Sequence, residues 1–197
     1  MVKRRTRKTA ATSRLGRDAW IAAGRDALIA GGVARVRIEP LAAALGVTTG
    51  SFYWHFKDRD ELLRALLADW RERNSAAMFA AVAQHAQAPQ HALRALVDVW
   101  IDEAAYSPAW DAAIRDWART SPEVEATVRR VDQRRIRLLQ SVFRRLGRTA
   151  PEAFIRARVM YFHQVGYYAL RIVESRARRR RLLPLYLRVL TGTDQLA

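Results

Sequence analysis

Apolar side chains recur at spacings of three and four residues along almost the whole of this 197-residue chain. That spacing places them on one face of an α-helix, whereas a half-buried strand would alternate apolar and polar residues. No convincing alternation of that kind is found. Half of the residues are hydrophobic, which is enough to bury the helix faces in a core. The pattern therefore predicts an all-α fold, without an internal repeat.

Helix-capping residues divide this pattern into about nine helices. Ser107-Pro108 and Ser121-Pro122 each place a capping serine before a proline in the first helical turn. Residues 149–152 supply the threonine and the glutamate of a capping box. These signals predict helices over residues 17–29, 38–45, 49–55, 58–85, 90–105, 108–119, 122–146, 151–176 and 180–191.

The formal net charge of +16 at pH 7 points to a polyanionic partner, either a nucleic acid or an anionic membrane surface. A compositional bias toward arginine and alanine is the other explanation, because lysine is rare beside arginine. Residues 1–16 are basic and polar and have no apolar face. We expect them to form a flexible arm that is disordered without DNA.

The sequence lacks the features that mark several classes of protein. The chain has no cysteine, which excludes disulfides, thiolate metal sites and a cysteine nucleophile. No run of about 18 uncharged apolar residues predicts a membrane span. The basic start is not followed by the apolar segment of a secretory signal. We therefore expect a cytoplasmic protein without a membrane partner.

No motif of enzymatic chemistry is present either. The chain lacks a glycine-rich phosphate loop, an HExxH metal motif and a serine in a nucleophile elbow. Asp98, Asp102 and Glu103 lie close together on one predicted helix, but a solvated helix surface produces such groups by chance. We predict no catalytic residue, no metal and no cofactor.

The segment from residue 38 to residue 56 has the local chemistry of a helix-turn-helix. Ala42 is small enough for the next helix to cross closely, and Gly46 permits the left-handed backbone of the turn. In the second helix, Phe52 and Phe56 are four residues apart and face inward. Small polar residues and aromatic residues remain for the other face, and such a helix can enter a major groove about 12 Å wide.

The sequence Leu41-Ala-x-x-Leu-Gly-Val-x-x-Gly-Ser-Phe-Tyr-Trp-His-Phe-Lys-Asp-Arg-x-x-Leu-Leu63 resembles the DNA-binding signature of the TetR/AcrR family of transcriptional regulators. The resemblance covers about residues 17–64. It implies a helix-turn-helix DNA-binding domain over 17–64 and a helical ligand-binding and dimerisation domain over 65–197. It also implies a homodimer whose last two long helices form a four-helix bundle, and release from DNA when a ligand binds.

Residue by residue, the resemblance places Thr49, Gly50 and Ser51 at the base edges and Tyr53 and Trp54 along the groove wall. Further DNA contacts, mostly with the backbone, are implied for Arg37, Thr48, His55, Lys57 and Arg59. The family usually has serine or threonine at the position of Arg37, which cannot cap a helix by accepting a hydrogen bond. The sequence therefore leaves undecided at which residue the helix predicted from residue 38 begins.

Structural roles compete with these assignments. Tyr53 could lie partly in the core, although its hydroxyl needs a polar partner. His55 could be a buried structural histidine. Residues 57–59 could form a solvated cap of the next helix. Thr49 and Ser51 could be turn residues only.

The C-terminal part is dense in aromatic residues, most of which must be core. His163 and Gln164 stand out as polar residues in an otherwise apolar helix, and apolar pockets with a few polar groups suit small hydrophobic or amphipathic ligands. The pocket candidates are Trp100, Trp110, Trp117, His163, Gln164 and Tyr167. The effector itself is not readable from the sequence.

One apolar stripe on the predicted helix over residues 151–176 suits a dimer seam, with Gly166 and Ala169 allowing close approach of a second helix. Burial within one subunit is the alternative. The stripe consists of Ile155, Val159, Phe162, Gly166, Ala169 and Val173. The arginine-rich residues 176–181 are expected to form a solvated turn.

These features together predict a sequence-specific, DNA-binding transcriptional regulator. We expect a dimeric repressor that leaves a palindromic double-stranded operator when a small molecule binds. The alternatives are a nonspecific architectural DNA-binding protein and a transcriptional activator with the same fold.

Overall fold

The computed structural model describes residues 16–192, and this part of the chain is helical, with no strand. The prediction of an all-α fold is confirmed. A short 3-10 turn, η1 (Val33–Arg35), follows the first helix. The α-helices are α1 (Arg17–Gly31), α2 (Ile38–Ala44), α3 (Thr49–Phe52), α4 (Arg59–Gln84), α5 (Pro89–Asp102), α6 (Pro108–Ala118), α7 (Pro122–Arg145), α8 (Ala150–Ala169) and α9 (Arg176–Thr191). The predicted basic arm lies outside the described residues except for its last one, Gly16.

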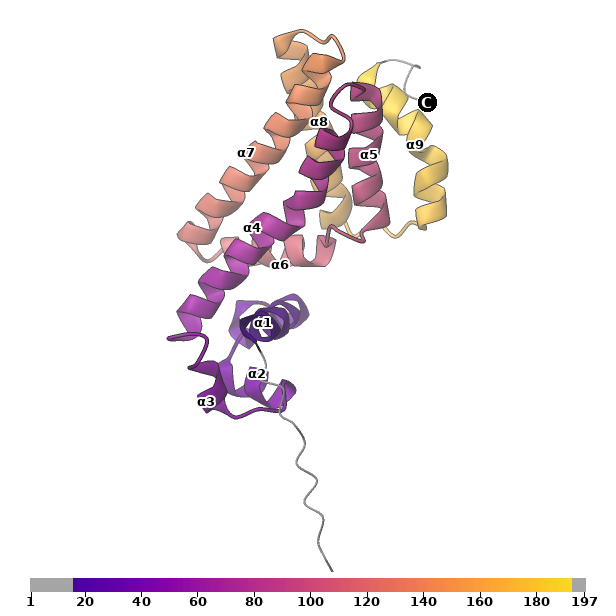
Figure 1. The fold of residues 1–197 in the computed structure, drawn as a ribbon. Helices are drawn as coiled ribbons and strands as arrows, with labels where there is room; N and C mark the ends of the chain where they lie inside the picture. The colour runs from indigo at the N-terminus through magenta and orange to yellow at the C-terminus, as the bar shows by residue number, and fades with distance from the viewer. Residues whose placement is uncertain (1–15, 193–197) are drawn as a thin grey trace, which may run out of the picture.

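The long helix α4 connects two parts of the molecule (Figure 1). Its start lies beside the small unit of α1, α2 and α3, and it then runs past α6 into the larger part of the fold. There it packs against α5 and α7, while α9 lies at the outer edge against α5 and α8. A shift of α4 would therefore be felt at both ends of the protein.

The hydrophobic core around the first three helices extends beyond them. Trp20, Phe52 and Leu66 belong to the same buried cluster as Trp110 of α6 and Val128 of α7. The boundary expected at residue 64 falls inside α4, and the apolar core is continuous across it. The N-terminal unit is thus held against α6 and α7 by side-chain packing.

A second hydrophobic cluster forms the centre of the larger part. It joins the end of α4 to α5, α7, α8 and α9 through buried side chains. Met78, Leu96, Phe143, Tyr161 and Leu187 represent the five helices in it. This cluster forms the scaffold on which the cavity described below is built.

Buried ions join the helices between the two clusters. Arg135 of α7 is 1% exposed, and its Nη1 donates to Asp111 Oδ1 of α6 at 2.9 Å. Arg115 donates from Nε to Asp111 Oδ2 at 2.8 Å and from both terminal nitrogens to Asp132, at 2.7 and 3.0 Å. The Tyr161 hydroxyl of α8 donates to Asp132 Oδ1 at 2.6 Å. We call these five residues the ion cluster.

The ion cluster also reaches α4. Asp111 Oδ1 accepts from Trp70 Nε1 at 3.2 Å and from Asn74 Nδ2 at 3.3 Å, and Arg135 Nε donates to Ser75 Oγ at 3.0 Å. Polar contacts therefore cross-link four helices, α4, α6, α7 and α8. In Figure 1, α6 lies at the lower end of the larger part of the fold.

The caps predicted from sequence are present at two helix starts. Ser107 Oγ accepts from the backbone N–H of Trp110 at 3.2 Å, and Thr149 Oγ1 accepts from that of Glu152 at 3.4 Å. Ser121 precedes α7 as predicted but makes no side-chain capping bond.

The largest boundary error concerns the last two helices. The helix predicted over 151–176 ends at Ala169, because Arg171 takes a left-handed conformation with φ of 53°. A new helix then starts at Arg176, where Ser175 Oγ accepts from the N–H of Arg178 at 3.2 Å. The tract over residues 176–181 was wrongly predicted as a solvated turn, since it forms the first turns of α9.

Candidate functional site

The turn between α2 and α3 has the geometry that its sequence predicts. Gly46 takes the left-handed conformation with φ of 67°, and the N–H of Val47 donates to the carbonyl of Ala42 at 3.0 Å. Helix α2 starts at Ile38 as predicted, although Arg37 before it makes no side-chain capping bond. These backbone contacts fix the turn between the two helices.

The inner face of α3 is fixed by aromatic packing. Phe52 and Phe56 are both buried, with ring centroids 5.3 Å apart, and Phe52 meets the edge of Trp20 at 5.2 Å. Both phenylalanines are core residues, as predicted. They hold α3 in one rotation about its axis, which decides which residues face outward.

The outer face of α3 and of the turn after it is open to solvent. Trp54 is 87% exposed and Tyr53 is 60% exposed, so the alternative that Tyr53 lies in the core is wrong. Thr49 and Gly50 are exposed, and Ser51 is half-buried. These five residues therefore form one accessible surface at the end of the molecule farthest from α9 (Figure 1).

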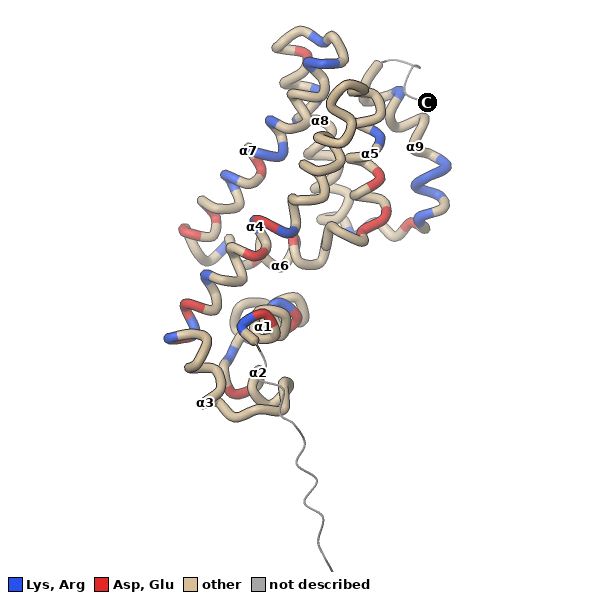
Figure 2. Tube along the Cα trace, in the orientation of Figure 1, with Lys and Arg blue, Asp and Glu red and all other residues tan. Residues whose placement is uncertain are grey.

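Four flanking residues predicted as backbone contacts surround this surface. Arg37, Thr48 and Lys57 are exposed, and His55 is half-buried. Thr48 is the residue before α3, but it makes no side-chain capping bond. Helix α3 carries no charge of its own, so positive charge beside it comes from neighbouring elements (Figure 2).

Arg59 has a structural role that the sequence did not reveal. Its Nε donates to the carbonyl of Val36 at 2.6 Å and its Nη2 to that of Val33 at 2.8 Å. These bonds tie the start of α4 to η1 and the residue that follows it. The first turn of α4 is capped by Asp58, whose Oδ1 accepts from the N–H of Glu61 at 2.8 Å.

Arg17 makes two contacts that the sequence did not reveal. Its guanidinium lies over the Phe56 ring, 4.5 Å from the centroid, and 3.7 Å from Glu61. The two contacts join the start of α1 to the end of the helix-turn-helix and to α4. No local signal in the sequence could have revealed them, because the partners lie 39 and 44 residues away.

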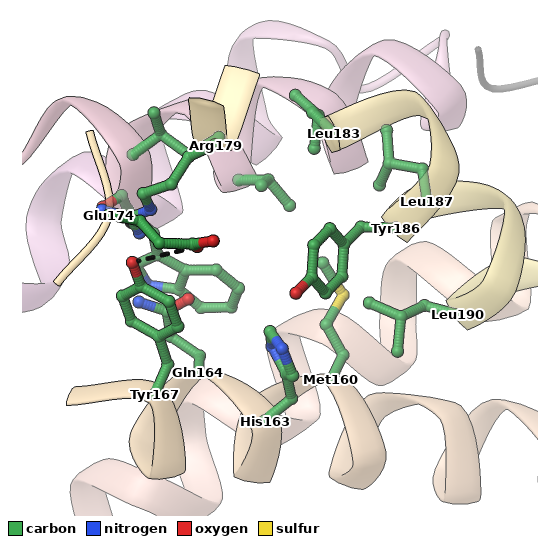
Figure 3. Close-up of a pocket in the computed structure, with 13 residues that line it drawn as sticks. Met160, His163, Gln164, Tyr167, Glu174, Arg179, Leu183, Tyr186, Leu187 and Leu190 are labelled. Carbon is green, nitrogen blue, oxygen red and sulfur yellow. Dashed lines mark hydrogen bonds between the residues drawn. The ribbon is translucent and has the colours of Figure 1, made fainter. Parts of the chain in front are cut away.

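A cavity with about 540 Å³ of empty space, part of it open to solvent, lies among α5, α8 and α9 (Figure 3). Four of the six predicted pocket residues line it, namely Trp100, His163, Gln164 and Tyr167. Three further residues that were not predicted from the sequence, Glu174, Arg179 and Tyr186, complete its polar side. They come from the end of the connection between α8 and α9 and from α9 itself, where the boundaries were predicted wrongly.

Trp110 and Trp117 do not line this cavity, so their grouping with Trp100 is wrong. Trp110 is buried in the core around the N-terminal unit. Trp117 packs against the same core and borders a groove between the starts of α4 and α7. Both residues lie on α6, which has no wall in the cavity.

Arg179 and Glu103 are paired at the edge of the cavity. Arg179 Nη1 donates to Glu103 Oε1 at 2.7 Å, and its Nη2 donates to the carbonyl of Trp100 at 3.1 Å. The Tyr168 hydroxyl donates to Trp100 O at 2.8 Å, and burial raises the pKa of Tyr168 to about 12. Burial, with Arg179 nearby, lowers the pKa of His163.

The predicted dimer stripe lies mostly on the surface of α8. Ile155, Val159 and Phe162 are each about half exposed, and Ala169 is also exposed. A Cβ atom on Gly166 would meet no atom of this chain within 4 Å. Val173 is exposed, but it lies beyond the end of α8 and not on the helical stripe.

Over residues 16–192, no group of three or more histidine, aspartate or glutamate side chains is placed to hold a metal ion. In the same range, no helix is long and apolar enough to cross a membrane.

Comparison with known sequences concerns the N-terminal part. Residues 21–66 match the sequence model of the bacterial regulatory proteins of the tetR family. The chain is 40% identical over 62 residues to the uncharacterized HTH-type transcriptional regulator TtgW of Pseudomonas putida, and equally so to the HTH-type transcriptional regulator SrpR of the same species. These matches cover 32% of this chain, and they cover 46% of TtgW and 29% of SrpR. The chain therefore spans less than half the length of these relatives.

Comparison with solved structures covers nearly the whole fold. A transcriptional regulator from Rhodococcus sp. Rha1 superposes with a TM-score of 0.68 at 24% identity, over 90% of this chain and 95% of that one. A second Rhodococcus protein, assigned to the TetR-family regulators, superposes with a TM-score of 0.59 at 19% identity, over 89% and 97%. The N-terminal part of the chain therefore carries the sequence signature of the tetR family of bacterial regulatory proteins, and the whole described fold is similar to these two solved structures.

Proposed function

We propose that this protein is a transcriptional regulator that recognises a double-stranded DNA operator through α3. The observation that carries the proposal is the division of α3 and the turn that follows it into two faces. Phe52 and Phe56 anchor it in the core, while Thr49, Tyr53 and Trp54 remain open to solvent. Small polar residues at the start of an anchored helix can approach base edges, and the aromatic residues that follow can contact sugar and phosphate.

The proposed regulator acts as a homodimeric repressor in the cytoplasm. A single helix-turn-helix contacts too few base pairs for genomic specificity, so two copies must reach two half-sites of a palindrome. The exposed stripe on α8 supports a seam between two copies. A small molecule in the cavity among α5, α8 and α9 would release the operator. We propose no catalytic step, and the relatives with matching N-terminal sequence are named as transcriptional regulators.

Base recognition is tested with Thr49→Ala and Ser51→Ala. Bound sequences are first selected from random duplex DNA, and each variant is then titrated against the selected duplex and a scrambled one. We expect each variant to lose about 1–3 kcal/mol of discrimination if it removes a base contact. Ser141→Ala, on the exposed face of α7, is the matched control and keeps full discrimination. Unchanged discrimination in both α3 variants would refute the assignment.

The selection also separates the two alternatives to a specific repressor. An enriched palindrome supports a dimeric reader of sequence. A nonspecific architectural protein would enrich nothing and would show only a salt-dependent affinity. An activator would enrich a palindrome too, so a reporter gene placed behind the selected sequence decides the sign of regulation.

The dimer seam is tested with Gly166→Leu. An added Cβ atom meets no atom of its own subunit within 4 Å, so there is room for a side chain to start at this position, and a leucine would obstruct a second copy packed against α8. We expect sedimentation to show monomers and operator binding to fall with dimer content. Gln133→Leu adds similar bulk to an exposed position on α7 and serves as the control. A Gly166→Leu protein that remains dimeric with full operator affinity places the seam elsewhere.

A further inference from the structure

We propose that the cavity among α5, α8 and α9 binds a neutral, largely apolar molecule whose single hydrogen-bond acceptor lies against the side-chain amide of Gln164. This inference rests on the proposed function, since it names the chemical class of the effector. Three observations support it: an unpaired buried donor, paired charges in the wall, and an otherwise apolar lining.

The unpaired donor is the Nε2 of Gln164. The residue is only 7% exposed, and this nitrogen has no hydrogen-bond partner within the described chain. Figure 3 shows Gln164 on the α8 wall of the cavity, between His163 and Tyr167. A buried donor without an acceptor destabilises a protein by about 1–3 kcal/mol. A carbonyl, ether or hydroxyl oxygen of a ligand would satisfy it.

The other two buried donors without a partner lie elsewhere. They are the indole nitrogens of Trp20 and Trp110, and both side chains belong to the core around the N-terminal unit. Of the three residues, Gln164 lines the cavity among α5, α8 and α9, whereas Trp20 and Trp110 do not.

The charged residues in the wall are already paired. Arg179 is bound to Glu103, which lies outside the lining, and Glu174 Oε1 accepts from Arg178 Nε at 3.0 Å. The lowered pKa of His163 keeps its imidazole neutral at pH 7. A charged ligand would have to share or break one of these pairs, which is unfavourable in a partly buried site. A neutral ligand leaves them intact.

The rest of the lining is apolar. Trp100 offers a flat aromatic surface, and Val97, Met160 and Leu187 surround it from α5, α8 and α9. An apolar molecule with an aromatic body therefore meets a matching surface beside Gln164.

The position of the cavity connects it to the proposed seam. Met160 and His163 line the cavity, whereas Val159 and Phe162 are exposed on another face of the same helix. No residue of α4 lines the cavity. A ligand in the cavity would therefore act on α8 and α9, and not directly on α4.

Matched probes test this class of ligand on the full-length protein. Benzophenone carries one ketone acceptor, diphenylmethane has nearly the same shape without it, and 4-benzoylbenzoate adds a negative charge. Binding is measured by titration calorimetry without DNA. We expect benzophenone to bind roughly 5- to 150-fold more tightly than diphenylmethane, because only the ketone satisfies Gln164. The benzoate should bind more weakly than the ketone.

Gln164→Leu is the variant that decides the role of the amide. It should bind the ketone and the hydrocarbon equally, and its melting temperature should not fall, because it removes an unpaired buried donor. Gln133→Leu, on the exposed face of α7, should keep the preference for the ketone.

The results that overturn the proposal are distinct. The claim that Gln164 binds the ligand's acceptor is wrong if the ketone binds no better than the hydrocarbon. It is also wrong if Gln164→Leu keeps the preference for the ketone. If the benzoate binds more tightly than the ketone, the claim that the ligand is neutral is wrong. If neither neutral probe binds near millimolar concentration, the proposed class of ligand is wrong. Because DNA is absent from the titration, these failures leave operator recognition standing. A protein that binds the ketone but enriches no DNA sequence refutes the proposed function alone.

Discussion

Replacing Asp111 with alanine should lower the free energy of unfolding by about 3–5 kcal/mol, as breaking a buried ion pair does. Asp111 is almost fully buried and accepts hydrogen bonds from both Arg115 and Arg135. Its removal leaves the guanidinium of Arg135 inside the protein without a carboxylate partner. Chemical unfolding followed by circular dichroism measures the loss.

An exposed ion pair of similar geometry serves as the control for Asp111. Glu125 accepts from Arg129 at 2.7 Å on α7, but its side chain is 57% exposed. Exposed pairs contribute only about 0–1 kcal/mol, so Glu125→Ala should be nearly neutral. Equal losses in the two variants would mean that the ion cluster does not stabilise the fold through its burial.

The effect of Asp111 should also depend on pH. Burial by itself raises the pKa of this carboxyl, but Arg135 and Arg115 outweigh it and hold the pKa below its ordinary value of 3.8. A carboxyl with a lowered pKa stabilises the fold fully above its unfolded pKa, and the contribution is lost as the pH falls through the folded pKa. The stability difference between wild type and Asp111→Ala should therefore be constant near neutrality and shrink below about pH 4.

Replacing Phe52 with alanine should destabilise the protein by about 3–5 kcal/mol, the range for truncating a buried aromatic residue. The ring has no exposed surface and packs against Trp20 and Phe56. The cavity left behind frees α3 to rotate, so operator binding should fall together with the melting temperature.

Trp54→Ala separates recognition from stability. Trp54 is only two residues away from Phe52 but points into solvent, and substitutions at such positions change stability by about 0.5 kcal/mol or less. We expect an unchanged melting temperature with weaker operator binding. If Phe52→Ala melts like the wild type, or if Trp54→Ala binds the operator fully, the division of α3 into an anchoring face and a reading face is wrong.

The sequence by itself determined the helices that have strong local signals. Apolar spacing and caps act between residues about three or four positions apart, so they could be recognised without knowledge of the fold. The all-α class, the turn at Gly46 and the burial of Phe52 and Phe56 were predicted in this way. The stripe on α8 was predicted by spacing as well, except for Val173, because no signal marked the end of that helix at Ala169.

Only the tertiary structure decided which distant residues meet. Asp111 contacts residues 24, 37 and 41 positions away, and Arg59 binds carbonyls 23 and 26 positions before it. Trp100 lines the cavity while Trp110 does not, although both are buried tryptophans. The spacing of apolar residues in a helix indicates which face is buried. Which other helix packs against that face depends on how the helices cross. For the same reason, the ion cluster and the unpaired amide of Gln164 became visible only once the helices were packed together.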